Sequence, residues 1–345
     1  MKKMLYLVLL LMMIFTVSAC SQNVEEPEVV IEEPTGDVIE TPEVTTPEEP
    51  LYVKAMTPEG ATTIAMLKMI YEQPELMNNV IVEYESINST DLLASEIIAE
   101  KVDFALIPTN LAIKLYNKGV PYKFVSINTH GNLYMITSED IDSWDSLKGK
   151  DVYMIGQGLV PDLIFRALLE ANGLDPENDL NIIYLAGTSE VGPTYIAGKS
   201  TITIMPEPVL STLDAKGISY NMLFDLQEEY EKISGIEGGF PQAGLVVRNT
   251  IAEVYPDLVV AFADALSESS DWLNEFPDLA GGYAEQLELG IPAPVFVKAV
   301  DGLNIRHEDA FLNKEKLESF FMMLYSFSPE AIGGKMPDED FYFKR

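Results

Sequence analysis

The feature that most restricts the fold of this chain is a regular alternation of short apolar runs with segments of helical spacing. Aliphatic runs of strand length recur along residues 51–248, and segments with apolar residues every three or four positions lie between them. Because such alternation is typical of a largely parallel sheet covered by helices, the sequence predicts an α/β fold. The expected strands are 51–56, 80–84, 104–107, 123–127, 151–155, 181–185, 201–205 and 245–248, and the expected helices are 61–71, 89–99, 111–118, 161–172, 255–274, 279–287, 294–302 and 314–327.

Two segments, 130–138 and 240–248, interrupt the alternation and indicate crossings between two lobes. We expect lobe 1 to comprise residues 51–136 and 246–345 and lobe 2 to comprise residues 137–245. The part after residue 248 lacks strand-like runs, so we expect helices there that cover lobe 1. Two short crossings allow hinged closure on a ligand through changes in a few backbone dihedral angles, and the pocket is expected where loops at the carboxyl ends of strands face each other.

The first residues carry signals for export. Lys2 and Lys3 precede an apolar run at 4–17, and small residues before Cys20 complete a signal peptide at 1–19. The run is too short to favour a membrane-spanning helix, which needs about 20 apolar residues. The sequence Val17-Ser18-Ala19-Cys20 resembles a bacterial lipobox and predicts that Cys20 becomes lipidated. The alternative is an ordinary secretory signal with an incidental cysteine.

Composition limits what the rest of the chain does. Residues 21–50 contain ten acidic residues, several prolines and no Lys or Arg, so with the lipidated cysteine we expect 20–50 to be a disordered acidic tether. The remainder holds 45 acidic against 20 basic residues, which disfavours nucleic-acid binding. Cys20 is the single cysteine of 345 residues, so we expect no disulfide, no thiolate nucleophile and no multi-cysteine metal site in the mature domain. We also predict no cofactor.

Loops that follow an expected strand and open an expected helix are the best candidates for ligand contact, because exposed backbone N–H groups and polar side chains meet there. In lobe 1 the first such loop holds Thr57, Glu59 and Gly60, and the second holds Thr109 and Asn110. Their hydroxyl, carboxylate and amide groups suit a small polar ligand. Capping of the following helices is the alternative role for these side chains.

Lobe 2 and the crossings supply the remaining candidates. In the loop at 156–161 two glycines allow close backbone approach, and Gln157 is the strongest candidate beside Gly158 and Val160. Glu207 follows the expected strand 201–205, and its carboxylate either accepts a hydrogen bond from a ligand N–H or binds its own hinge backbone. Further candidates are Thr188, Ser189, Gln242 and His130.

The charges in these loops bear on the ligand. A fully charged oxyanion normally calls for Arg or Lys, and none lies within the four main loops. Arg166 lies well inside its helix and is expected to face away. Glu59 and Glu207 therefore favour a neutral or cationic organic ligand, such as a nitrogen heterocycle, although helix N-termini leave nitrate or sulfonate open.

Several local sequences across residues 51–345 carry a family resemblance. They are Val102-Asp103-Phe104-Ala105-Leu106-Ile107-Pro108, Leu115-Tyr116-Asn117-Lys118-Gly119, Trp144-Asp145-Ser146-Leu147-Lys148-Gly149-Lys150, Leu168-Leu169-Glu170-Ala171-Asn172-Gly173-Leu174-Asp175, Glu207-Pro208 and Val246-Val247-Arg248. The order and spacing of these segments resemble those of one family of ABC-transporter substrate-binding proteins. It is the nitrate/sulfonate/taurine/thiamine-precursor (NMT1/SsuA-like) family. We expect Trp144 and its neighbouring turn to pack in the fold.

This resemblance implies a two-lobe periplasmic-binding-protein fold of type II with two hinge crossings. It also implies a monomeric, extracytoplasmic solute-binding lipoprotein, held to the cell membrane by its lipid. Such a protein binds a small organic molecule by hinge closure and delivers it to an ABC permease and its ATPase, and it has no catalytic residues.

Two alternatives remain open at this point. The resemblance includes thiamine-pyrimidine synthases, enzymes on the same fold with a cysteine-rich iron site and a reactive histidine. The mature chain has no cysteine after position 20 and only His130 and His307, and we expect His307 at a solvated helix start, so we predict that the chain is not an enzyme. No Gly-x-Ser-x-Gly elbow or zinc-binding histidine pair is present. The third reading is a ligand-sensing surface lipoprotein.

Overall fold

The computed structural model describes residues 46–345. The expected signal peptide, Cys20 and most of the expected tether therefore lie outside the described residues. Within the described part, no helix has both the length and the apolar character needed to cross a membrane.

Six strands form one sheet, named sheet A here, in the order β11-β4-β10-β3-β1-β2. Strand β1 pairs in parallel with β2 and β3, whereas β10 lies antiparallel between β3 and β4, and β11 is antiparallel to β4 at the edge. The strands are β1 (Leu51–Pro58), β2 (Val80–Ile87), β3 (Phe104–Pro108), β4 (Tyr122–His130), β10 (Pro241–Arg248) and β11 (Ile305–Asp309).

Five strands form the second sheet, sheet B, in the order β7-β6-β8-β5-β9. Strand β6 is parallel to β7 and β8, and β5 is antiparallel to β8 and β9. The strands are β5 (Leu133–Thr137), β6 (Asp151–Met154), β7 (Asn181–Tyr184), β8 (Ile202–Pro206) and β9 (Asn221–Asp225).

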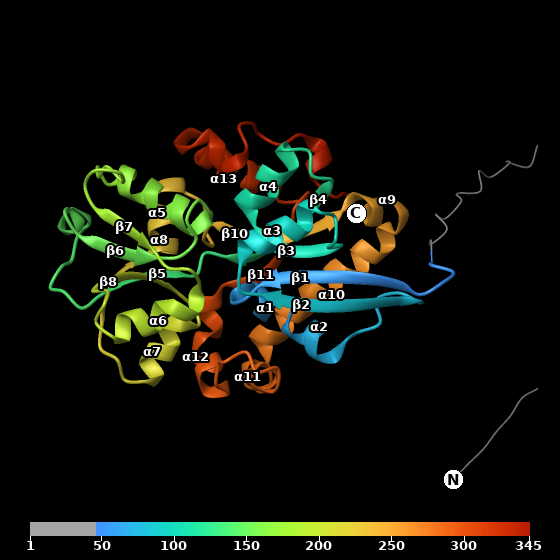
Figure 1. The fold of residues 1–345 in the computed structure, drawn as a ribbon, viewed down its shortest axis with the longest axis horizontal. Coiled ribbons are helices and arrows are strands. Elements are labelled where there is room, and N and C mark those ends of the chain that lie inside the picture. The colour runs from blue at the N-terminus through green and yellow to red at the C-terminus, as the bar shows by residue number, and fades with distance from the viewer. Residues whose placement is uncertain (1–45) are drawn as a thin grey trace, which may run out of the picture. The chain divides into compact units, whose positions relative to one another are not determined.

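Helices cover both sheets (Figure 1). Those of lobe 1 are α1 (Ala61–Ala65), α2 (Leu67–Glu72), α3 (Thr90–Ile98), α4 (Thr109–Asn117), α9 (Asn249–Val254), α10 (Pro256–Glu275), α11 (Pro277–Gln286), α12 (Ala293–Leu303) and α13 (Lys314–Phe327), with short 3₁₀ turns η2 (Pro329–Ile332) and η3 (Glu339–Phe341). Those of lobe 2 are α5 (Val160–Ala171), α6 (Thr188–Ile196), α7 (Val209–Ala215) and α8 (Leu226–Ser234), with the 3₁₀ turn η1 (Trp144–Leu147).

The inner strands of sheet A are apolar on both faces because helices cover both faces. In β3, Ala105 and Ile107 pack in one core with residues of α3, α4 and α13, whereas Phe104 and Leu106 pack in another core with residues of α1, α2 and α10. Phe104 stacks on Phe262 of α10 with the ring centroids 4.1 Å apart. Two-sided burial explains the near-continuous apolar runs in the sequence, and it leaves the loops at the strand ends to contact a ligand.

The α/β prediction is confirmed, but several elements differ from expectation. Strand β5 begins at Leu133 and β10 begins at Pro241, so sheet pairing takes up most of the two segments expected to be linkers. Strand β11 contradicts the expectation that only helices follow residue 248. His307 lies on this strand, with its Nδ1 3.1 Å from Nδ2 of Asn128, and not at a solvated helix start. The ring of Trp144 stacks on Phe224 at 4.1 Å, in agreement with a packing role.

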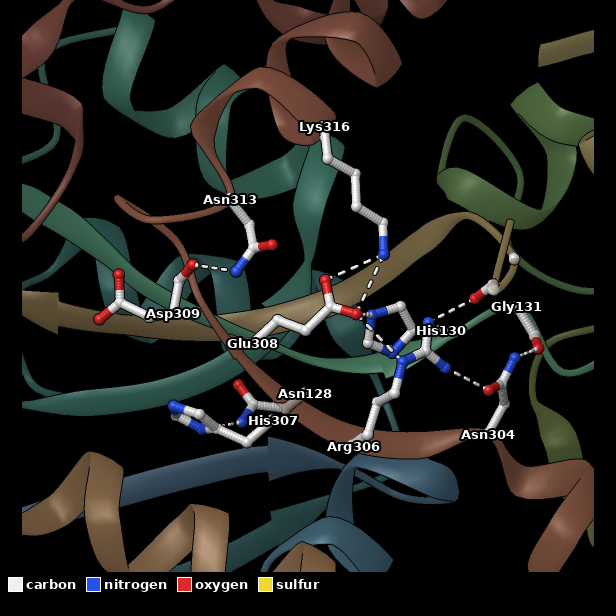
Figure 2. A network of polar contacts seen from close by, with 12 residues as sticks. Asn128, His130, Gly131, Asn304, Arg306, His307, Glu308, Asp309, Asn313 and Lys316 are labelled. Atoms are coloured by element: carbon white, nitrogen blue, oxygen red, sulfur yellow. Dashed lines mark hydrogen bonds and ion pairs between the residues drawn. The ribbon is translucent and has the colours of Figure 1, made fainter. Parts of the chain in front are cut away.

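The two segments that join the sheets pass close to each other. A Cβ atom on Gly131, in the first crossing, would lie 2.5 Å from Cε1 of Phe240 in the second. Asn304, just before β11, donates from Nδ2 to the carbonyl oxygen of Gly131 at 2.9 Å. The guanidinium of Arg306 donates both to Asn304 Oδ1 and to the carbonyl oxygen of Gly238. Side chains at the start of β11 thus contact both crossings (Figure 2).

Glu308 is the centre of this network (Figure 2). Its carboxylate accepts from Arg306 Nε at 3.0 Å and from Lys316 Nζ at 2.9 and 3.0 Å, and its Oε1 lies 3.1 Å from Nε2 of His130. Burial lowers the pKa of His130 to about 4, so the ring is neutral near pH 7. Burial alone would raise the pKa of Glu308, but contacts with His130 and Lys316 outweigh it and hold this pKa well below its usual range.

Candidate functional site

A cavity of about 540 Å³ lies between the two lobes. Lobe 1 contributes the loops that follow β1 and β2, and lobe 2 contributes the loops that follow β6, β7 and β8. The ends of β4 and β10 and the first crossing form the side near the hinge. The cavity therefore lies at the strand-end position predicted for the ligand, and its volume is typical of small-molecule sites.

Seven of the residues predicted from the sequence line this cavity, and six do not. The lining residues are Glu59, Gly60, Gln157, Thr188, Ser189, Glu207 and Gln242. The others are Thr57, Thr109, Asn110, His130, Gly158 and Val160, of which all but Gly158 are almost fully buried.

The buried candidates hold the loops in place. Thr109 donates from Oγ1 to the carbonyl oxygen of Pro241 at 2.7 Å, which joins α4 to β10. Asn110 donates from Nδ2 to the carbonyl oxygen of Gly158 at 3.0 Å and to that of Ala331 at 3.4 Å. The bond to Gly158 links lobe 1 with lobe 2, so two residues expected to contact ligand instead contact each other.

The loop after β6 is fixed by a second set of polar contacts. Asp162 Oδ2 accepts from the backbone N–H of Gly158 at 2.8 Å, and its Oδ1 accepts from Arg166 Nε at 2.8 Å and from Tyr184 Oη at 2.6 Å. Arg166 also donates to Glu177 at 2.5 Å. Two carboxylates neutralise this arginine and keep it out of the cavity lining, as the sequence suggested.

The structure also shows cavity residues that sequence reasoning missed. Tyr184 lines the cavity at the end of β7, and its pKa is raised to about 12, chiefly by burial and next by the hydrogen bond to Asp162. The loop that joins β2 to α3 contributes Asn88 and Ser89, and the first turn of α3 contributes Thr90 and Asp91. This loop has the same strand-end and helix-start pattern as the chosen loops, so the signal was present in the sequence.

Glu207 lines the cavity and also binds the backbone of the helix that follows it, α7. It is only 7% exposed, and its carboxylate accepts from the backbone N–H of Ser211 at 3.1 Å and from Ser211 Oγ at 2.9 Å. Burial raises its pKa. On its other side, α12 approaches so closely that a Cβ on Gly302 would lie 3.0 Å from Cγ of Glu207.

All charged side chains that line the cavity in the described part of the chain are acidic. Glu59, Asp91 and Glu207 are acidic, whereas no Lys, Arg or His among residues 46–345 lines the cavity. No group of three or more His, Cys, Asp and Glu in this part of the chain is arranged to hold a metal ion. The lining therefore offers mainly hydrogen-bond acceptors and negative charge.

Near the hinge, three polar atoms of lining residues are buried without a hydrogen-bond partner among the described residues. They are Oγ1 of Thr129, Oδ1 of Asn132 and Oε1 of Gln242. An unpaired buried polar atom costs about 1–3 kcal/mol. Because these three atoms are closed to solvent, a ligand would reach them only after the lining moves.

A hinged pair of α/β lobes around a polar cleft defines the class of type II periplasmic binding proteins, and comparisons with known proteins agree. The model of the family described as NMT1/THI5 like matches residues 77–280, which is more than half of the chain. The chain belongs to this family, which confirms the resemblance found in the sequence. No curated protein sequence matches the chain.

Solved structures show the same fold. An ABC transporter protein from Parabacteroides distasonis is 25% identical, with a TM-score of 0.72 over 85% of this chain and 99% of that one. The alkanesulfonate-binding protein SsuA from Xanthomonas axonopodis pv. citri, bound to MOPS, is 13% identical, with a TM-score of 0.63 over 81% and 94%. The nitrate-binding protein NrtA from Synechocystis PCC 6803 is 15% identical, with a TM-score of 0.58 over 74% and 71%.

Proposed function

We propose that this chain is the solute-binding lipoprotein of an ABC importer, which captures a small organic molecule in the interlobe cavity and delivers it to a permease and its ATPase. The family, the fold and the polar cavity between the lobes support this role. The position of the cavity carries the proposal, because loops at the strand ends of both lobes line it and would enclose a small molecule there.

The ligand we propose is neutral or cationic and rich in N–H donors. Glu59, Asp91 and Glu207 place carboxylate oxygens in the lining, which accept hydrogen bonds, and the side-chain amides of Asn132 and Gln242 can accept as well as donate. An oxyanion would face these carboxylates without an opposing Arg or Lys in the lining. Although two proteins of similar fold are a sulfonate-binding and a nitrate-binding protein, the lining here favours an amine or a nitrogen heterocycle.

Binding is proposed to close the lobes about the two crossings. With the strands as the structure has them, lobe 2 would comprise about residues 132–240, a few residues earlier at each end than the sequence suggested. The bond from Asn110 to the carbonyl oxygen of Gly158 joins the lobes on one side of the cavity. The loops after β2 and β7 already lie close together across the cavity, since a Cβ on Gly187 would lie 3.9 Å from the Asn88 carbonyl oxygen.

We propose binding without catalysis. The synthase alternative needs a reactive histidine, and neither histidine lines the cavity. His130 is fully buried beside Glu308, and His307 lies against Asn128.

Lipidation of Cys20 is proposed from the sequence alone and would hold the protein as a monomer on the extracytoplasmic face of the cell membrane. In the native host, Cys20→Ser should shift the protein from the membrane fraction to the soluble extracytoplasmic fraction, with no labelling by an alkyne palmitate analogue. Labelling of the Ser variant at the wild-type level would contradict this part of the proposal.

The binding role is tested by denaturing freshly purified protein and identifying released molecules by mass spectrometry, together with thermal shifts against a metabolite panel. We expect one small N–H-bearing molecule per protein, and weaker binding of it by Gln242→Ala. The control, Gln286→Ala, removes an exposed amide outside the cavity and should bind normally. No released molecule and no thermal shift, or consumption of a panel compound by the protein, would refute the proposal.

A further inference from the structure

A second cavity of about 660 Å³ adjoins the first between the same two lobes. Both cavities are lined by Glu59 and Gly60 of lobe 1 and by Thr188 and Ser189 of lobe 2. The two spaces are therefore parts of one cleft that meet at this shared rim. Gly60 has φ 113°, a backbone conformation that favours glycine, and a Cβ there would meet no atom within 4 Å.

The second cavity differs from the first in its chemistry. Away from the rim it is lined mainly by apolar side chains from both lobes, among them Ile64 of α1, Leu289 of the loop before α12, Ile196 of α6 and Leu213 of α7. Its charged lining residues beyond the rim are Lys216 and Glu288, which carry opposite charges on opposite lobes. One end of the cleft thus offers hydrogen-bond acceptors, and the other offers apolar surface.

Ile64 and Leu213 are buried, whereas Leu289 is half-buried and Ile196 is exposed. Ile196 keeps 42% of its surface exposed although it faces a cavity. Helices α6 and α7 approach each other closely, since a Cβ on Gly192 would lie 3.2 Å from Cγ1 of Val209. Because the two helices are already in close contact, they cannot move toward each other to fill the second cavity. An apolar group from outside the chain would gain free energy here by removing this surface from water.

We infer that the ligand has two parts, a polar N–H-bearing head in the first cavity and an apolar chain or ring that extends past the shared rim into the second. The inference rests on the proposed function and names its ligand class as an amphiphilic amine or heterocycle. Each cavity alone has the volume of a small-molecule site, so a small polar metabolite would occupy only one of them. Apolar lining on both lobes places the second part where closure would bury it.

The test uses primary n-alkylamines from butylamine to dodecylamine, titrated into the purified protein by calorimetry. Because a buried methylene contributes about 0.8 kcal/mol, affinity should rise by about two- to fourfold per added methylene until the chain fills the second cavity. Ile196→Asp places a charge in this cavity at an exposed position and should abolish the dependence on chain length. Met222→Asp alters a comparably exposed apolar residue of β9, 46% exposed and outside both cavities, and should retain that dependence.

The possible results separate this inference from the proposed function. Affinity that is independent of chain length, or a chain-length dependence that Ile196→Asp leaves unchanged, would refute the second subsite. If no alkylamine binds and the molecule released from purified protein lacks an apolar part, the two-part ligand is wrong while the binding role stands. If nothing is released and nothing binds, the binding role fails as well.

Discussion

Asn110→Ala should both destabilise the protein and loosen the contact between its lobes. The side-chain amide donates to two backbone carbonyl oxygens, that of Ala331 within lobe 1 and that of Gly158 on lobe 2. A hydrogen bond contributes about 0.5–1.5 kcal/mol net. Loss of both bonds should therefore lower the free energy of unfolding by about 1–3 kcal/mol, and loss of the interlobe bond alone should shift the equilibrium toward open forms by about two- to tenfold.

The same helix provides a matched control. Asn117 also donates from Nδ2 to two backbone carbonyl oxygens, those of Ile332 at 2.6 Å and Lys335 at 2.7 Å, and both acceptors belong to lobe 1. Asn117→Ala should therefore reduce stability without changing the separation of the lobes. The comparison isolates the interlobe bond from the general cost of removing an amide from α4.

Two measurements are needed. Urea unfolding gives the stability change, and pulsed electron paramagnetic resonance gives the distance distribution between spin labels at Lys118→Cys in lobe 1 and Glu170→Cys in lobe 2, in a Cys20→Ser background. We expect a broader and longer distribution for Asn110→Ala only. If both alanine variants lose stability but keep the wild-type distribution, the bond to Gly158 does not restrain the lobes, and the reasoning is wrong.

Two further predictions concern the hinge. Gly131→Ala places a Cβ 2.5 Å from the ring of Phe240, so thermal unfolding should show a loss of about 1–3 kcal/mol in stability. The control, Gly282→Ala in α11, has no atom within 4 Å of the new Cβ and should gain up to about 1 kcal/mol in stability. Equal effects of the two changes would contradict the tight crossing. Burial lowers the pKa of His130 from 6.5 to about 4, so as the pH falls the unfolded state binds a proton before the folded state does. The free energy of unfolding should therefore be highest above pH 6.5 and fall by about 3 kcal/mol toward pH 4. His130→Gln should flatten the pH dependence of urea unfolding across this window, and an unchanged slope would exclude His130 as its source.

The alternation of patterns predicted most elements because packing on both faces of the sheets demands apolar strands. It failed at β9 and β11, each of which forms one edge of its sheet, and it did not predict the lobe 2 helices α6, α7 and α8. Strand β11 reads Ile-Arg-His-Glu-Asp, and charged side chains are typical of edge strands, so no apolar run marks it. Strand β5 has a clear apolar run from Leu133 to Thr137, but its position between two halves of the pattern suggested a linker.

The site was predicted at the level of loops better than at the level of side chains. Glu59, Gln157 and Glu207 line the cavity because they follow strands at the edge where the lobes meet. Thr109 follows a strand as well, but its hydroxyl turns to the carbonyl oxygen of Pro241. That acceptor lies on β10, which enters sheet A antiparallel between β3 and β4, and a local pattern does not show which distant strand will lie beside a given loop.

The placement of β10 also determines the order in which the two lobes can complete their folding during synthesis. Sheet B uses only strands between Leu133 and Asp225, whereas β3 and β4 of sheet A lack the strand between them until Pro241–Arg248 has been synthesised. The lobe that begins later in the chain is therefore complete earlier. Until then, the nascent chain carries two apolar strands with open edges, which are prone to wrong pairing. Its need for protection should therefore last until Arg248 has emerged.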